Sequence, residues 1–321
     1  MKVLGIIAGR PRHNSEFWMQ AALEGAEEAG AEVELINLRN LDLNACTGCG
    51  ACHRGRFKSG KGACIFEDDM PWLDEQILSC DGMIVCAPCF EQSPPSELKL
   101  FCDRLGPSHD VVHLRQAHET LLARGEEGYD LRWFQRRPCA FISHGGSEWT
   151  TLGLPILNTI AIPLGMKIVD QLNYSFTNDC VLEDSKIERV RLLGRHVAEN
   201  CGKTEEEMTY WGDPGHCPIC HNRTMVLGDR PEEVTCAVCG ITGTLHLSDG
   251  RLQVTYTADE LKRSHMTDSG KYLHMLDMNM KGKQEMIRPK LRKEEVNARI
   301  RMGTGRYRAQ TPAQRTEQHT N

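Results

Sequence analysis

Hydrophobic runs alternate with amphipathic stretches over the first 200 residues, and this alternation predicts the secondary structure. Residues 3–7 form a short apolar run with β-branched members, typical of a strand covered on both faces. From residue 15 to residue 29, apolar residues recur at three- and four-residue steps and Gly30 follows as a stop signal, which predicts an amphipathic helix. Further strands are expected at residues 32–38, 82–87, 139–143 and 167–170, and further helices at residues 95–105, 152–164 and 187–197.

Strands that alternate with helices predict a doubly wound α/β fold, here with a five-stranded parallel sheet. Ligands of such a fold bind at the carboxyl ends of the strands. The loops that follow the first, third and fourth predicted strands have unusual compositions, so we expect the binding site there.

The first of these loops, residues 9–15, combines a flexible glycine with two guanidinium groups, those of Arg10 and Arg12. Asn14 and Ser15 are small polar residues that can cap the next helix. Exposed N–H groups at a helix start, together with arginine, favour an anion, so the loop predicts a phosphate site. An ordinary capped turn is the alternative.

The other two loops suit a flat ring. The second is rigid and proline-rich and offers an aromatic side chain and a thiol, whereas adjacent glycines in the third let backbone amides approach a ligand closely. The candidate residues are Pro88, Cys89, Phe90, Glu91, Gln92 and Ser93 in the second loop, and Ser143, His144, Gly145 and Gly146 in the third. Together the loops predict a slot for a phosphate at one end and a flat heterocycle at the other.

A group of cysteines lies between the second and third predicted strands. Cys46, Cys49 and Cys52 are spaced at three-residue steps, and eleven residues separate Cys52 from Cys64. Three thiolates so spaced can wrap one corner of a 4Fe-4S cluster, and a fourth on a longer loop can close it. Reduced structural thiols are the alternative, and a single zinc ion is less apt for this spacing.

A second cysteine group predicts a zinc ribbon. Cys217 and Cys220 form one C-x2-C knuckle, Cys236 and Cys239 form another, and fifteen residues separate the two. Short strand-like pieces flank them at residues 224–227, 244–247 and 251–256. A module this small has little core, so the ion contributes much of its folding energy. A rubredoxin-type iron site is the rival.

Composition places these sites in a reducing compartment. The chain has 321 residues, of which 40% are hydrophobic, with no run of about 18 apolar residues and no signal-peptide core at the start, so we expect a soluble, cytoplasmic protein with no membrane contact. Most of the 15 cysteines lie in close groups or singly in apolar runs, which favours metal ligands and reduced thiols over disulfides.

Charge and length predict that the chain has three parts. Residues 1–205 are expected to form the α/β domain, residues 206–257 the ribbon, and residues 258–321 an extension that is helical over 258–280 and then basic. Residues 281–321 contain eleven Lys or Arg and four Glu. The net charge of −6 is therefore the sum of +7 in this tail and −13 in the rest of the chain, the body. Residues 106–137 interrupt the domain and suit a lid or a subunit contact, with His109, His113 and His118 most simply explained as solvated side chains.

The loops and one helix resemble those of the flavodoxin-like FMN reductases, and more narrowly of the iron-sulfur flavoproteins. The resemblance covers roughly residues 1–200 and is most specific at Lys99-x-Phe101-x-Asp103-Arg104. It implies FMN, with its phosphate at residues 10–15 and its isoalloxazine against residues 88–93 and 143–146. Arg10, Glu16 and Phe17 depart from the pattern, because small polar residues are usual there.

The resemblance also bears on the cysteine loop and on assembly. The iron-sulfur flavoproteins have a similar cysteine group followed by acidic residues, although their gap before the fourth cysteine is usually shorter. Those proteins assemble as oligomers, so a homodimer or homotetramer is implied.

The function expected from these features is an FMN-dependent oxidoreductase. It would transfer electrons between NAD(P)H or a ferredoxin-type donor and a small-molecule or protein acceptor, through an iron-sulfur cluster. The alternative is a redox-responsive binding protein whose ribbon and basic tail hold nucleic acid or a protein partner.

Overall fold

The computed structural model describes residues 1–58, 62–287 and 290–303, and its main feature is a five-stranded parallel sheet. The strands are β1 (Lys2–Ile7), β2 (Glu32–Asn37), β3 (Gly82–Pro88), β4 (Pro138–His144) and β5 (Lys167–Tyr174), in the spatial order β2-β1-β3-β4-β5. All neighbouring pairs are parallel, so their carboxyl ends share one edge of the sheet. The predicted flavodoxin-like fold is confirmed.

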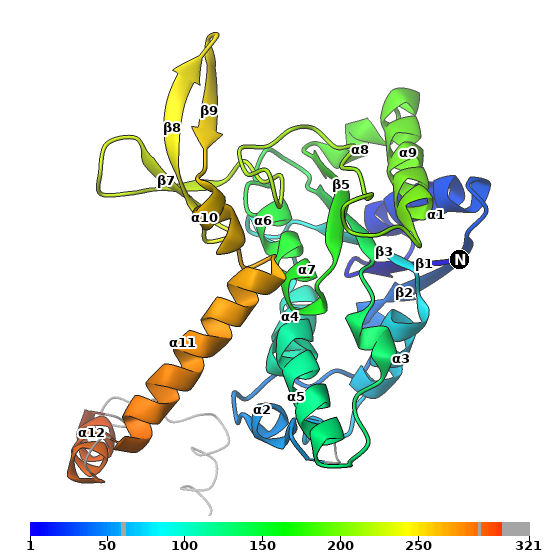
Figure 1. Ribbon diagram of the computed structural model, residues 1–321. Coiled ribbons are helices and arrows are strands. Elements are labelled where there is room, and N and C mark those ends of the chain that lie inside the picture. Colours follow the sequence, from blue (N-terminus) through cyan, green and yellow to red (C-terminus); the bar gives the residue numbers. More distant parts are fainter. Residues whose placement is uncertain (59–61, 288–289, 304–321) are drawn as a thin grey trace, which may run out of the picture. The chain divides into compact units, whose positions relative to one another are not determined.

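Helices cover both faces of the sheet (Figure 1). On one face lie α1 (Asn14–Glu28) and α9 (Asp184–Asn200), and on the other α3 (Met70–Ser79), α4 (Ser96–His109), α6 (Gly153–Asn158) and α7 (Ala161–Leu164). The first pair packs closely, because a Cβ at Gly194 would lie 1.7 Å from the Ala22 carbonyl oxygen and one at Gly25 would lie 1.9 Å from that of Arg191. Two separate apolar cores, one per face, therefore hold the carboxyl edge in place.

The insertion at residues 106–137 is a scaffold for the first cysteine loop. It forms α5 (Val111–Ala123) and the short helix η2 (Leu131–Phe134), and it packs beside α2 (Ala51–Gly55), which carries Cys52. The Tyr129 hydroxyl donates to the Arg56 carbonyl at 2.7 Å, just after α2.

The second, smaller sheet is antiparallel. It contains β6 (Met225–Leu227), β7 (Glu233–Cys236), β8 (Thr242–Ser248) and β9 (Arg251–Thr255) in sequence order. The strand-like pieces predicted from the sequence correspond to β6, β8 and β9, whereas β7 was not predicted.

The helix predicted over residues 258–280 is found as two helices, α10 (Ala258–Lys262) and α11 (Asp268–Ile287). Thr267 Oγ1 bonds the Lys262 and Ser264 carbonyls at the break, which replaces the helical backbone pattern. A last helix, α12 (Lys290–Gly303), follows.

The chain divides into two compact units, Met1–Leu273 and His274–Asn321. About half of the predicted basic tail, residues 288–289 and 304–321, lies outside the described residues. No helix in the described part of the chain has the length and apolar composition needed to cross a bilayer.

Candidate functional site

The first loop leaves the start of α1 open to a ligand. The N-cap residue is His13, and its side chain makes no capping hydrogen bond. Asn14 Nδ2 instead donates to Asn178 Oδ1 at 2.8 Å, and Ser15 Oγ lies 2.8 Å from His144 Nε2. The prediction that Asn14 and Ser15 cap the helix is therefore wrong, because both side chains are engaged in tertiary contacts.

The backbone before α1 is held in a tight turn. A Cβ at Gly9 would lie 2.2 Å from Ser15 Oγ, so only glycine fits there without a shift. Arg12 has a left-handed φ of 57°, and its N–H donates to Glu16 Oε2 at 2.7 Å. Arg10 and Arg12 are both exposed. A helix start without a side-chain cap, beside two guanidinium groups, is an arrangement that would favour an anion.

The second loop is a tight turn that presents an aromatic ring to solvent. Glu91 and Gln92 have φ values of 48° and 69°, and the Phe90 N–H donates to the Ser93 carbonyl at 2.7 Å. Phe90 is consequently 53% exposed. Pro88, the last residue of β3, is buried directly behind this turn.

The second and third loops are joined by Cys89. Its N–H donates to the His144 carbonyl at 2.7 Å, and its Sγ lies 3.4 Å from Ser143 Oγ. Burial raises the pKa of the Cys89 thiol, so the protonated form is favoured. Cys89 is therefore a half-buried thiol that connects the second and third loops.

His144 is a buried, neutral imidazole that links the first and third loops. It is 3% exposed, and burial lowers its pKa to about 4. Its Nε2 is near Ser15, but its Nδ1 is buried without a hydrogen-bond partner among the described residues. Such a polar atom is expected to meet a ligand or water.

The glycine pair of the third loop is partly enclosed and partly open. The Gly145 N–H donates to the Tyr174 carbonyl and its own carbonyl accepts from Thr177, both at 2.9 Å. A Cβ at Gly146 would meet no atom within 4 Å. Backbone at Gly146 is thus free to lie against a flat ligand.

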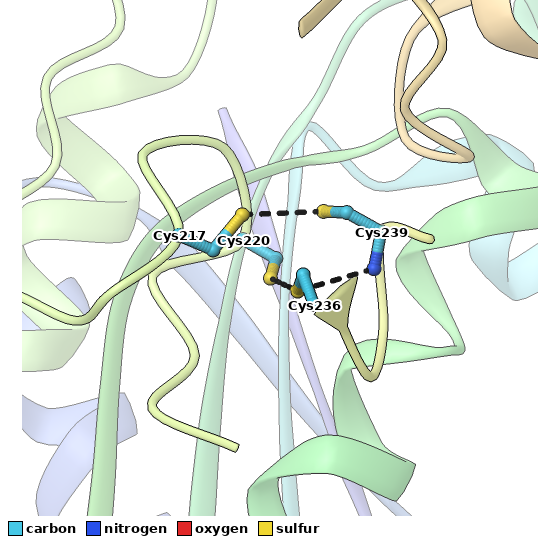
Figure 2. Close-up of side chains that lie close together, drawn as sticks. All are labelled: Cys217, Cys220, Cys236 and Cys239. Atoms are coloured by element: carbon cyan, nitrogen blue, oxygen red, sulfur yellow. Dashed lines mark hydrogen bonds between the residues drawn. The ribbon is translucent and has the colours of Figure 1, made fainter. Parts of the chain in front are cut away.

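The ribbon cysteines form a compact group of thiols (Figure 2). All four sulfurs are buried and lie within 4.8 Å of one another, with Cys217 and Cys239 at 3.6 Å and Cys220 and Cys236 at 3.5 Å. Around a tetrahedral ion with metal–sulfur bonds of ~2.3 Å, sulfurs would lie ~3.8 Å apart. The group therefore fits one four-coordinate metal ion.

The first cysteine loop is held at both ends by a buried ion pair. Arg104 of α4 pairs with Asp68, and its Nη1 donates to the Asn44 carbonyl at 2.9 Å. Asp68 also accepts the N–H groups of Asn44 and Met70. Burial alone would raise the pKa of Asp68, but the guanidinium and these N–H groups lower it to about 2.

The thiols of that loop are not arranged around a single ion. Cys46, Cys49 and Cys64 are exposed and Cys52 is half-buried, and in the described part of the loop they do not approach as closely as the ribbon thiols. A cubane cluster binds each thiolate to a different iron, so it needs wider sulfur spacing than one ion does. The arrangement thus does not match a single tetrahedral ion, whereas the wider sulfur spacing is compatible with a cluster.

Comparison with known proteins shows which family the chain belongs to. The profile of the family described as NADPH-dependent FMN reductase matches residues 1–178. The chain belongs to this family. The predicted enzyme class, an FMN-dependent oxidoreductase, is confirmed.

Relatives of this chain carry more specific names. It is 31% identical over 290 residues to the flavone synthase cfoJ of Aspergillus candidus, covering 87% of this chain and 88% of that protein. It is 28% identical over 209 residues to the iron-sulfur flavoprotein MJ1083 of Methanocaldococcus jannaschii, covering 62% of this chain and 96% of that protein. A solved structure described as a flavone reductase matches with a TM-score of 0.82 and 28% identity, covering 97% of this chain and all of that one.

The carboxyl edge of the parallel sheet fits FMN, the cofactor of this family. The uncapped start of α1 with Arg10 and Arg12 suits the phosphate, and Phe90 and Gly146 lie where a flat ring could rest. The partnerless Nδ1 of His144 offers a polar atom between them. FMN, when bound, supplies the ring that accepts and passes on a hydride.

Two exposed aromatic residues near these loops were missed by sequence reasoning. Trp149 is 57% exposed after the glycine pair, and Phe176 is 51% exposed after β5. Trp149 could have been found from its position three residues beyond Gly146. Phe176 could not, because β5 was predicted to end at Asp170.

Proposed function

We propose that this member of the FMN reductase family uses NADPH to reduce a planar aromatic acceptor of the flavone class. The observation that carries the proposal is the set of exposed aromatic side chains, Phe90, Trp149 and Phe176, on the loops at the carboxyl edge. Such rings stack well on a planar aromatic ligand. The flavone synthase cfoJ, which matches 87% of this chain, and the flavone reductase structure, which matches 97% of it, are both named for flavones, and this supports the same acceptor class.

The reaction adds two hydrogens to a carbon–carbon double bond conjugated to a carbonyl group. One NADPH gives a hydride and is oxidised to NADP⁺, and one proton completes the product. In this chain, Arg10, Arg12 and the start of α1 hold the cofactor phosphate, while the aromatic residues orient the acceptor and exclude water.

We propose that the loop containing Cys46, Cys49, Cys52 and Cys64 holds a 4Fe-4S cluster. Support comes from the three-residue spacing, the anchoring of the loop at both ends by Arg104, and the likeness to iron-sulfur flavoproteins. The cluster would supply one-electron transfer to or from the flavin, so a ferredoxin-type donor is a second route for electrons.

We propose zinc as the ion of the ribbon. The close, buried set of four thiols and the small module around it support a structural site rather than an electron-transfer site. Metal analysis of purified protein distinguishes zinc from iron.

The acceptor assignment is tested with Trp149→Ala. The anaerobic kcat/KM for a hydroxylated flavone should fall about tenfold, because aromatic pairs contribute about 0.5–1.5 kcal/mol beyond the area that they bury. Trp72→Ala is the matched control, since Trp72 of α3 is also exposed but lies outside the three loops. Equal rates for the Trp149 variant and the unmodified protein, or no flavone reduction by either, would contradict the proposal.

A further inference from the structure

A cavity of about 360 Å³ lies along the free edge of β5, beside the third loop. Its volume is in the range of small-ligand sites. One wall is the segment from Thr150 to Pro155, the floor is β5, and the opposite wall is the ribbon segment from His221 to Thr224.

The floor offers backbone hydrogen-bonding groups. β5 is an edge strand, and its Tyr174 carbonyl accepts from Gly145 on the β4 side, whereas its Val169 carbonyl accepts from Trp211 on the opposite side. Backbone groups alternate in direction along a strand, so those of Gln171 and Asn173 face the free edge, as Val169 does. The Gln171 N–H is already bonded to Asp170 Oδ1, which leaves the Asn173 N–H and the two carbonyl groups for a ligand.

The cavity adjoins the ring end of the cofactor site. Thr150 is shared by both, because a Cβ at Gly145 would lie 2.5 Å from Thr150 Cγ2. Thr150 is also fixed by Asn173, whose Nδ2 donates to its Oγ1 at 2.8 Å. A ligand long enough to extend from the third loop past Thr150 would enter the cavity.

The ribbon wall is held in place by buried amides. Gln171 Nε2 donates to the His221 carbonyl and Asn222 Nδ2 donates to Asn158 Oδ1, both at 2.8 Å. Asn158 Nδ2 in turn donates to Gln171 Oε1 at 2.9 Å. Because these side chains are buried and mutually bonded, the ribbon is a preformed wall rather than a loose neighbour.

The cavity has the chemistry of a phenol site. Leu154 and Pro155 give apolar surface for a ring, and threonine hydroxyls and the strand edge can bond ring hydroxyls. Arg223 supplies an exposed guanidinium that favours the phenolate form, and Asp213 can accept from a neutral phenol.

We propose that this cavity binds the hydroxylated phenyl end of the acceptor, while the rest of the acceptor lies against the flavin. The proposal rests on the proposed function for the acceptor class, and it adds the residues that select hydroxylated members. The ribbon then has a direct part in acceptor recognition, through Arg223 and Thr224.

The test is calorimetric titration of FMN-loaded full-length protein with 4′-hydroxyflavone and with unsubstituted flavone. Arg223→Gln should weaken binding of 4′-hydroxyflavone about tenfold, because a charge-assisted hydrogen bond is lost, and should leave unsubstituted flavone unaffected. Thr151→Trp should weaken both ligands by filling the cavity. Arg251→Gln, which changes an exposed arginine of β9 outside the cavity, is the matched control. Unchanged FMN and metal contents would show that the variants fold.

The outcomes distinguish failure of the cavity assignment from failure of the proposed function. Equal affinities in the unmodified protein and both cavity variants, an equal loss in the Arg251 variant, or no flavone binding at all would overturn the cavity assignment. Binding that depends on Arg223 without NADPH-driven reduction would support the cavity and overturn the proposed function. Reduction of 4′-hydroxyflavone that neither cavity variant affects would support the proposed function and overturn the cavity assignment.

Discussion

At the scale of single residues, His144 of the third loop contacts Ser15 of the first loop and Cys89 of the second. Its imidazole is buried, its Nε2 meets Ser15, and its Nδ1 is left for a ligand or water. Because burial lowers its pKa to about 4, the ring is neutral at neutral pH. Protonation in the folded state would place a charge in a site that has little solvent.

We therefore expect stability to fall as pH falls between about 6.5, the ordinary histidine pKa, and about 4. In that window the unfolded chain binds a proton at His144 that the folded chain does not, so acid favours unfolding. His144→Asn should flatten this pH dependence, whereas His246→Asn in the ribbon should keep it. Urea unfolding midpoints between pH 7 and pH 4.5 measure the effect, and parallel curves for the His144 variant and the unmodified protein would refute it.

The buried ion pair of Arg104 and Asp68 makes a second prediction at the residue scale. Arg104→Met leaves Asp68 buried without its partner, which should cost about 3–5 kcal/mol. It should also release both ends of the first cysteine loop and reduce bound iron. Lys99→Met, which removes an exposed lysine of the same helix, should have little effect. Denaturant unfolding and iron analysis provide the measurements, and an Arg104 variant as stable as the Lys99 variant would contradict this role.

At the scale of elements, the ribbon and β5 depend on each other. The ribbon carbonyls of Cys220 and His221 accept from Gln171, and the Trp211 N–H bonds β5 at Val169. An ion bound by the four ribbon thiols, as proposed above, should therefore also stabilise the outer strand of the main sheet.

Cys220→Ser should remove the ribbon ion and increase amide hydrogen exchange at both the ribbon and β5. Cys201→Ser is the control, because Cys201 is outside the group of four ribbon thiols. Its Sγ donates to the Val197 carbonyl of α9 instead. Hydrogen exchange followed by mass spectrometry reports both segments. Protection of β5 that survives loss of the ion would show that the two elements are independent.

Elements with strong periodicity were predictable, and those whose residues serve other contacts were not. β1, β3 and β4 read as apolar runs because both faces of each are covered. β5 continues to Tyr174 although its sequence turns polar, because Asp170 pairs with Arg189 and His196, and Gln171 bonds the ribbon. β7 was missed because it mixes polar residues with one of the ribbon cysteines, Cys236.

The candidate site was also predictable only in part, namely where it depends on apolar strands and on cysteine spacing. Loops at the carboxyl ends of apolar strands could be located, and the cysteine spacing of the ribbon indicated a metal site. The capping role of Asn14 and Ser15 was wrong, since distant residues attract their side chains. The cavity beside β5 needs residues from the third loop, β5 and the ribbon, so no local pattern could predict it.

At the scale of the whole molecule, association remains a proposal. The exposed aromatic side chains of the slot would be partly covered by a second copy, and the negative body would offer a partner for a basic tail. We expect a homodimer or homotetramer by light scattering across a dilution series. A monomer that keeps its FMN and full turnover at every concentration would contradict this assembly.

The central claim is that electrons pass from NADPH through FMN to a flavone-class acceptor. Anaerobic turnover with a hydroxylated flavone, followed by both NADPH absorbance and product mass, tests it most directly. The expected result is one NADPH oxidised for each product molecule, with a mass gain of two hydrogens and activity that depends on FMN. Oxidation of NADPH without a change in the mass of the flavone, while a small quinone is readily reduced, would contradict the acceptor class.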